Sequence, residues 1–384
     1  MQKLPQRAWA EISLDAIRNN LIQIKSHLGP DTKINGVVKA DGYGHGAIMT
    51  AGLLCENGVD MLSVATLDEA IQLRNSNIDI PLLVLGYTET NRIEEVFENN
   101  IIVTLYEKEQ AKTLSDEAVS HGCTIEAHIK IDTGMNRIGF RHIEEEAIVN
   151  AYRLKGIDVK GTFTHFSTAD EEDTGYTDLQ YGRFIKVLDK LRKEGIDPGI
   201  CHSNNSGATV LHPGKKLDMI RVGLLLYGMY PSSYSGRNNS YGLTPAMILK
   251  ARIIQVKTLE KDESVSYGNK FTAERKTRVA TISCGYADGF SRALSGKTHV
   301  LVNGCRAPVI GSICMDMFMV DVTDTEGPVK SGDTAVLFDD EITAGDIASM
   351  TGTINYEVVS RVGIRIPRVY TESGRIVNVN NYLL

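Results

Sequence analysis

A lysine near the N-terminus follows an apolar run, in a position where its side chain could act as a nucleophile. Lys39 comes directly after Val37 and Val38 and before a glycine-rich stretch that contains Tyr43 and His45. At the end of a buried strand, a lysine is partly removed from water, which lowers the ammonium pKa from about 10.4 toward a range where the neutral amine is available. A neutral amine is what a Schiff-base lysine requires. A salt-bridged structural lysine fits the same position, and both interpretations stay open.

A second group of charged side chains lies between residues 128 and 139. Strand alternation places Lys130 and Asp132 on one face, and Arg137 follows in a loop bounded by glycines. A cluster of cations at one place indicates an anionic ligand. An ion pair between Lys130 and Asp132 would explain the same residues without any ligand, so this alternative also stays open.

Three further apolar runs end in polar residues. His165 ends one of them, Ser206 follows the next, and Arg221 lies inside the third, just before Gly223 and Leu224. A lone histidine is more often structural than functional, whereas an arginine inside an apolar strand needs an acceptor. The Ser206 hydroxyl and the amides after Arg221 suit a phosphate group. A lysine, a phosphate pocket and a buried arginine together suggest pyridoxal phosphate as the ligand.

Repeated strand and helix units must position these side chains. The first 230 residues alternate between short β-branched runs and longer segments of helical period. Eight strands with intervening helices in roughly 230 residues predict an α/β fold with a (β/α)8 TIM-like barrel, whose active site lies at the carboxyl ends of the strands. The eight expected strands are 34–39, 61–65, 81–85, 101–105, 125–131, 159–165, 199–204 and 219–225.

The chain changes character after a polar, glycine- and serine-rich stretch at 230–242. Short strand-like runs follow, and Asn303 with Gly304 is typical of a type I′ hairpin turn. A helix is expected near 344–350. We therefore expect a barrel domain over 1–240 and a mostly β domain over 241–384. The expected β-domain strands are 247–256, 278–284, 299–302, 308–310, 318–322 and 334–338.

Composition excludes several classes of protein. The 384 residues carry a formal net charge of −7, which argues against a nucleic-acid partner. Apolar runs such as 222–230 are far shorter than the ~20 residues of a membrane span. The N-terminal residues lack the apolar segment of a secretory signal, so a cytoplasmic location is expected. Six cysteines without a Cys-x-x-Cys pair favour a reducing compartment over a disulfide framework or a zinc site, and no metal is expected.

Eight motifs make the chain resemble the alanine racemase family of fold-type III pyridoxal-phosphate enzymes. They occur in the family's order and cover essentially the whole length. The motifs are residues 38–45, 130–139, 164–170, 221–223, 265–268, 285–289, 314–316 and 353–357. The resemblance implies racemisation of L-alanine and D-alanine with pyridoxal 5′-phosphate, a role in supplying D-alanine for peptidoglycan, and a homodimer with shared active sites.

The same resemblance implies a role for each matching residue. Lys39 and Tyr267, the latter from the partner chain, match the two catalytic bases. Arg137 and the Met315 backbone amide match the groups that bind the substrate carboxylate. The cofactor-binding residues implied are Lys39, Tyr43, His165, Ser206, Arg221, Gly223, Leu224 and Tyr356, with Lys130 as a possible carbamylated lysine and Asp170 and Tyr286 at the entrance.

Other functions stay open at this stage. A serine or broad-specificity racemase is the main alternative, although Tyr356 leans toward alanine. Ser312 stands where many relatives carry an arginine near the entrance, so substrate access is expected to differ. A decarboxylase of the same fold type is disfavoured because Arg221 replaces an acidic partner of the pyridine nitrogen. A non-catalytic pyridoxal-phosphate-binding protein is disfavoured because the chain has a whole β domain.

Overall fold

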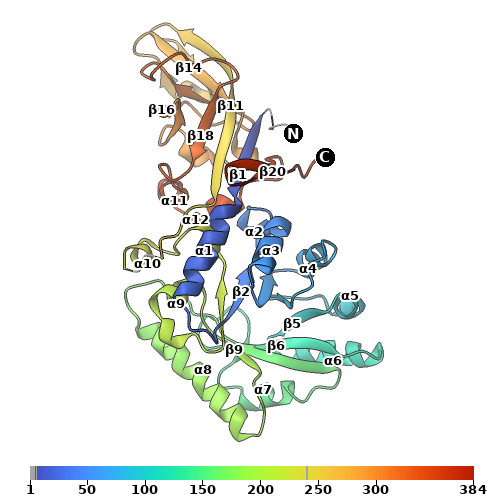
Figure 1. The fold of residues 1–384 in the computed structure, drawn as a ribbon. Helices are drawn as coiled ribbons and strands as arrows, with labels where there is room; N and C mark the ends of the chain where they lie inside the picture. Colours follow the sequence, from blue (N-terminus) through green and yellow to red (C-terminus); the bar gives the residue numbers. More distant parts are fainter. Residues whose placement is uncertain (1–4, 6, 239–240) are drawn as a thin grey trace. The chain divides into compact units, whose positions relative to one another are not determined.

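The computed structural model describes Pro5 and residues 7–238 and 241–384. Contacts divide the chain into two compact units, coloured along the sequence in Figure 1. The barrel unit comprises Arg18–Tyr43 and Ala47–Thr244, and the β unit comprises Met1–Ile17, Gly44–Gly46 and Pro245–Leu384. The division therefore differs from the expected boundary near 240, because the first strand pairs with strands from the C-terminal third.

Eight parallel strands close the barrel unit into a ring. They pair in chain order, and the last strand pairs with the first through Arg221 and Asn35. All eight expected strands and the barrel fold are thus confirmed. The strands are β2 (Lys33–Val37), β3 (Met61–Val64), β4 (Leu82–Val84), β5 (Ile101–Leu105), β6 (Ile125–Asp132), β8 (Ile157–Phe163), β9 (Ile200–His202) and β10 (Met219–Val222), with the short β7 (Phe140–Arg141) beside β6.

Helices surround the barrel strands, as Figure 1 shows for α3 to α8. The longest of them, α8, buries an apolar face that includes Phe184, Leu188 and Leu191 and turns its charged residues outward. In the described part of the chain, no helix is long and apolar enough to cross a membrane. The helices are α1 (Leu14–Ser26), α2 (Lys39–Tyr43), α3 (Ala47–Glu56), α4 (Leu67–Arg74), α5 (Ile93–Glu98), α6 (Lys108–Ser120), α7 (Glu145–Ala151), α8 (Gly175–Lys193), α9 (Ser206–Leu211) and α10 (Ser233–Asn238).

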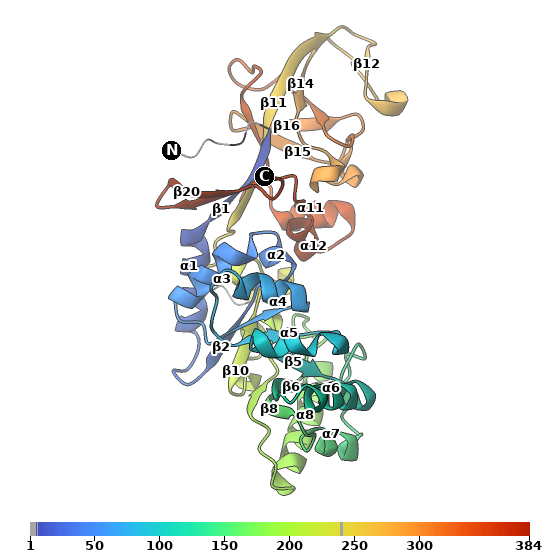
Figure 2. The same ribbon diagram turned by 90° about the vertical axis from the view of Figure 1, so that its right-hand side faces the viewer.

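The β unit is built on a mostly antiparallel sheet. Its order is β14-β17-β16-β15-β18-β11-β1-β19-β20, and β14 also pairs with β11. Figure 2 shows β14 beside the long β11, and α11 next to α12. The strands are β1 (Ala8–Ser13), β11 (Met247–Leu259), β12 (Ser264–Val265), β13 (Phe271–Thr272), β14 (Thr277–Ile282), β15 (His299–Val302), β16 (Cys305–Ile310), β17 (Phe318–Asp321), β18 (Thr334–Phe338), β19 (Arg368–Glu372) and β20 (Arg375–Asn380), with helices α11 (Ala344–Thr351) and α12 (Asn355–Ser360).

The sequence predicted much of the β unit and missed some of it. The six expected strands and the helix at α11 are present, and the turn between β15 and β16 has positive φ at Asn303 and Gly304, as a type I′ turn requires. The strands β1, β12, β13, β19 and β20 and the helix α12 were not expected. The pairing of β1 with β11 and β19 joins residues that are far apart in the sequence, which local periodicity does not detect.

Candidate active site

Lys39 lies directly after β2, at the carboxyl end of a barrel strand. The chain then turns left-handed, with positive φ at five successive residues, 40–44. A left-handed run costs about 1–2 kcal/mol per non-glycine residue, so surrounding contacts must hold it. Two hydrogen bonds do so: Gly42 N–H donates to Val38 O at 2.8 Å, and Ala47 N–H donates to Asp41 Oδ1 at 2.9 Å. This strained turn fixes the direction in which the Lys39 side chain leaves the strand.

The environment of Lys39 favours the neutral amine. Burial lowers the pKa of Lys39, and the nearby cations Arg137 and Arg221 lower it further, while Glu69 acts in the opposite direction. The neutral form expected from the sequence therefore has a physical basis in the structure.

Arg221, on β10, is buried, and its guanidinium makes several hydrogen bonds. Nη2 donates to Thr164 O at 2.7 Å and Ser203 O at 3.0 Å, and Nη1 donates to His202 O at 3.1 Å and His202 Nδ1 at 2.8 Å. Nη2 also lies 3.4 Å from Nδ1 of His165. Burial lowers the pKa of Arg221 to about 9, so the side chain is still a cation at neutral pH.

Two histidines extend this contact into the barrel. Because Arg221 donates to Nδ1 of His202, the proton of neutral His202 sits on Nε2, which donates to His128 Nδ1 at 2.9 Å. Burial lowers the pKa of His128 to about 3 and that of His202 well below its usual value, so both rings are neutral. His128 was not among the site residues predicted from the sequence. Its spacing of two from Lys130 on one strand was the available signal.

Lys130 is buried without an anionic partner. It is 3% exposed, its Nζ lies 4.7 Å from the centre of the Phe163 ring, and no residue in the described ranges forms an ion pair with it. The alternative of a Lys130–Asp132 pair is not observed, because the Asp132 carboxylate instead accepts the amides of Gly134 and Asn136 at 2.9 and 3.1 Å. Burial and the cations Arg221 and Arg137 lower the pKa of Lys130 to about 7.

A small polar cradle forms where α9 begins beside β10. Gly223 N–H donates to Ser206 Oγ at 3.3 Å, and a short 3-10 helix (Leu224–Tyr227) starts directly after Gly223. A Cβ at position 223 would lie 2.6 Å from Tyr43 Oη, so only glycine allows the tyrosine to approach this closely. Two helix N-termini and a hydroxyl side by side suit a phosphate group.

The remaining barrel residues from the sequence analysis also lie near this mouth. Arg137 makes no hydrogen bond or ion pair within the part that the structure describes, and its charge acts on Lys39 and Lys130. Asp170 lies beside the start of α9, where a Cβ on Gly207 would be 3.0 Å from the Asp170 Cβ. Lys39, Lys130 and Arg137 thus act on one another as like charges, which favours an anionic ligand among them.

In the β unit, Tyr267 is presented to solvent by a strained turn. Its side chain is 74% exposed, and the preceding Ser266 has a positive φ of 68°. Ser266 Oγ donates to Ser312 O at 2.7 Å, and Ser312 Oγ donates to Tyr267 O at 3.3 Å. Ser312 is 1% exposed, and its hydroxyl supports the backbone of Tyr267; its effect on the entrance stays a prediction.

Tyr286 and Met315 lie on two loops that hydrogen bond to each other. Tyr286 N–H donates to Cys314 O at 3.1 Å, and Ala287 N–H donates to Met315 O at 3.0 Å. Both the Tyr286 and the Met315 side chains are exposed, whereas Tyr356 of α12 is partly buried. The β unit therefore carries four predicted site residues, and the barrel unit carries the others.

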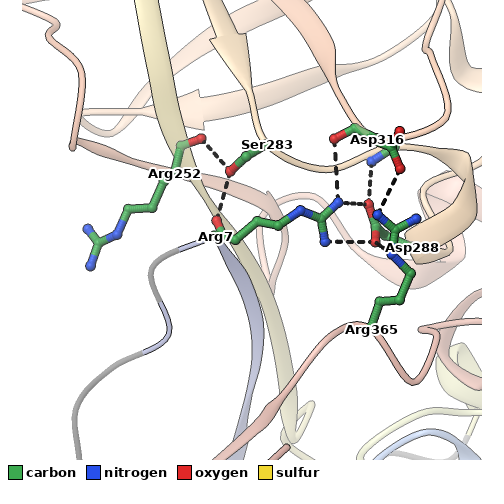
Figure 3. A network of polar contacts seen from close by, with 7 residues as sticks. Arg7, Arg252, Ser283, Asp288, Asp316 and Arg365 are labelled. Atoms are coloured by element: carbon green, nitrogen blue, oxygen red, sulfur yellow. Dashed lines mark hydrogen bonds and ion pairs between the residues drawn. The ribbon is translucent and has the colours of Figure 1, made fainter. Parts of the chain in front are cut away.

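A buried ionic network fixes these two loops, as Figure 3 shows. Asp288 is fully buried and accepts hydrogen bonds from Arg7 Nη1 at 2.9 Å, Arg7 Nη2 at 2.5 Å and Gly285 N–H at 2.9 Å. Arg365 Nε lies 3.5 Å from Asp288 Oδ1, and Arg365 Nη2 donates to Asp316 Oδ1 at 2.7 Å. Arg365 thus links Asp288, on the Tyr286 loop, to Asp316, the residue after Met315.

We expect Asp288→Asn to destabilise the β unit by about 2–4 kcal/mol, because it leaves two arginines beside a neutral buried group. Urea unfolding followed by Trp9 fluorescence measures this, since the chain's one tryptophan is buried in β1. Glu341→Gln, which breaks the exposed pair with Arg306, is the matched control and should cost less than about 1 kcal/mol. Equal effects of the two substitutions would contradict the role given to Asp288.

Comparisons with known proteins cover both units. Residues 12–231 match the family profile described as "Alanine racemase, N-terminal domain", and residues 246–370 match "Alanine racemase, C-terminal domain". The chain is 44% identical over 381 residues to an alanine racemase of Clostridium perfringens, with 98% of each chain covered. The same coverage accompanies 42% identity to alanine racemase 1 of Clostridium acetobutylicum.

Solved structures give the same result. The alanine racemase of Clostridium difficile 630 is 43% identical, with a TM-score of 0.95 over 100% of both chains. The alanine racemase of Bacillus anthracis with bound L-Ala-P is 36% identical, with a TM-score of 0.93 over 100% of this chain and 99% of the other.

Proposed function

Because the chain belongs to the alanine racemase family, we propose that it interconverts L-alanine and D-alanine by a two-base mechanism with Lys39 and the partner subunit's Tyr267. One observation carries the proposal: a lysine whose pKa is lowered lies among cations at the mouth of the barrel. Racemisation removes a proton from one face of the α-carbon and returns one to the other face. Two bases on opposite faces are therefore sufficient.

The family depends on pyridoxal 5′-phosphate, and the residues at the mouth fit this group. The cradle next to Gly223, which a Cβ would fill, offers amides and hydroxyls for a phosphate. When bound, the cofactor withdraws electrons from the α-carbon of the substrate and so makes the α-proton acidic. We propose that Tyr43, Ser206, Gly223, Leu224 and Tyr356 hold the phosphate, Lys39 binds the cofactor covalently, and Arg221, supported by His165, faces its ring nitrogen.

Arg221 would restrict the chemistry to proton exchange. A guanidinium at the ring nitrogen would disfavour a second positive charge there, so Arg221 would keep that nitrogen unprotonated. The neutral His202 and His128 behind Arg221 add no competing cation. Arg221 would thereby weaken the electron withdrawal that the bound cofactor supplies, which would disfavour side reactions such as transamination.

Substrate recognition would use Arg137 and the Met315 backbone amide, both acting on the carboxylate. Arg137 is a suitable anchor because no carboxylate in the described ranges neutralises it. We propose that Tyr286 and Asp170 line the entrance. Tyr267, Tyr286 and Met315 are exposed in the β unit, which supports their delivery to the partner's site in a homodimer.

Lys130 is expected to be carbamylated. Only a neutral amine adds carbon dioxide, forming an N–C bond and releasing one proton, so the carbamate should form above pH 7 and be lost as the pH falls through the Lys130 pKa of about 7. The resulting anion would orient Arg137. Native mass spectrometry in bicarbonate buffer should find one added carbon dioxide per chain, absent in Lys130→Ala. The same added mass in that variant would contradict the assignment.

The experiment that tests the proposed function measures racemisation of L-alanine and D-alanine by the holoenzyme, with serine assayed alongside. Conversion of alanine in both directions is the expected result. Turnover of serine at the same kcat/KM would favour a broad-specificity racemase instead. The cytoplasmic location and the supply of D-alanine for peptidoglycan stay predictions from the sequence.

A further inference from the structure

The carboxylate of Glu69 joins the ends of two adjacent barrel strands. Glu69 Oε1 accepts the amide of Ala40 at 2.7 Å, and Glu69 Oε2 accepts the amide of Ala65 at 2.7 Å. Ala40 follows Lys39 directly, and Ala65 follows β3. Glu69 itself is fixed in the first turn of α4, where its amide donates to the N-cap Thr66 at 3.3 Å.

These hydrogen bonds begin where the strand ladder ends. Val38 N–H donates to Ser63 O at 2.9 Å in the last bond between β2 and β3. Two residues later, Ala40 has a φ of 52° and starts the left-handed turn, so its amide cannot continue the ladder. Glu69 accepts this amide instead. It therefore holds the backbone on the carboxyl side of Lys39 in its strained conformation.

Glu69 is also the negatively charged group that acts on the pKa of Lys39. Of the charged groups that act on this lysine, Arg137 and Arg221 lower its pKa and Glu69 raises it. The same side chain thus affects both the geometry and the basicity of Lys39.

We infer that Glu69 is a positioning residue for Lys39, which clamps the turn after β2 and sets the direction and charge balance of the lysine amine. The inference rests on the proposed function, in which Lys39 binds the cofactor. Nothing in this role requires Glu69 to contact cofactor or substrate.

The test follows capture of pyridoxal 5′-phosphate by the apoprotein, using the absorbance band of the lysine-bound cofactor between pH 6 and pH 10. Glu69→Gln keeps one acceptor oxygen but turns an NH2 group toward the second amide, so one amide loses its partner. We expect its maximal capture rate and its kcat for alanine to fall about tenfold, with KM changed less than about twofold. The pH of half-maximal capture should move lower, because the neighbouring negative charge is gone.

Two further variants separate geometry from charge. Glu69→Asp keeps the charge but is too short to reach both amides, so its capture rate should fall while its pH midpoint stays near that of the parent. Asp68→Asn changes the adjacent exposed residue, which pairs with Arg92, and should match the parent in both measurements. Wild-type rates and midpoint in Glu69→Gln would overturn the inference. A wild-type apoprotein that forms no band dependent on Lys39 would instead overturn the proposed function, and the inference with it.

Discussion

Lys39→Ala is expected to reduce racemisation by on the order of 10⁴-fold or more, as loss of a central nucleophile does in other enzymes. The variant loses the amine that holds the cofactor and one of the two proposed bases at once. The absorbance band of the lysine-bound cofactor should disappear as well, which a spectrum of the purified protein measures.

Lys33→Ala is the matched control. Lys33 is an exposed lysine at the opposite end of the same strand, so its removal should change neither the spectrum nor the rate. A Lys39→Ala protein that keeps the band would show that another lysine binds the cofactor. It would therefore contradict the site assignment.

Tyr267→Phe should lower kcat for racemisation by about 10²–10⁴-fold, the usual contribution of one general acid or base. The substitution removes one hydroxyl on an exposed side chain of the β unit, whereas the cradle and Lys39 belong to the barrel unit. Cofactor binding should therefore be unchanged. Loss of the cofactor band together with activity would mean that Tyr267 has a structural role instead.

Proton exchange gives a sharper result for the same variant. In D2O, one base remains to remove and return a proton on its own face, so one enantiomer of alanine should still exchange its α-proton without inversion. Proton NMR of L-alanine and D-alanine incubated separately measures this. Inversion at the parent rate would contradict the two-base mechanism.

The sequence predicted the barrel because its signal is local. Each barrel strand is a short β-branched run between helical segments, and the functional residues end those runs, as Lys39 and His165 do. The placement of Lys39, Arg221, Ser206 and Gly223 at one mouth then follows from the topology alone.

Other features depend on contacts that a single sequence does not reveal. Arg7 and Asp288 are 281 positions apart, and β1 joins the sheet of the C-terminal third. In the sequence, Glu69 looks like an ordinary acidic residue in the first turn of a helix. Only the structure shows that its two oxygens accept the amides of Ala40 and Ala65 at the ends of two strands. In the sequence, the left-handed turn was signalled mainly by Gly42 and Gly44, because residues such as Ala40 and Tyr43 rarely adopt positive φ.

A mixed-dimer experiment tests the central claim, that each active site takes Lys39 from one chain and Tyr267 from its partner. Equal amounts of the inactive Lys39→Ala and Tyr267→Phe variants are mixed under conditions that allow subunit exchange, and alanine racemisation is measured. In a symmetric dimer with shared sites, random exchange would make half of the dimers mixed. Each mixed dimer would hold one site with both Lys39 and Tyr267 and one site with neither. Activity should therefore recover to about one quarter of the parent. A mixture that exchanges subunits, confirmed by native mass spectrometry, yet stays inactive would contradict the claim.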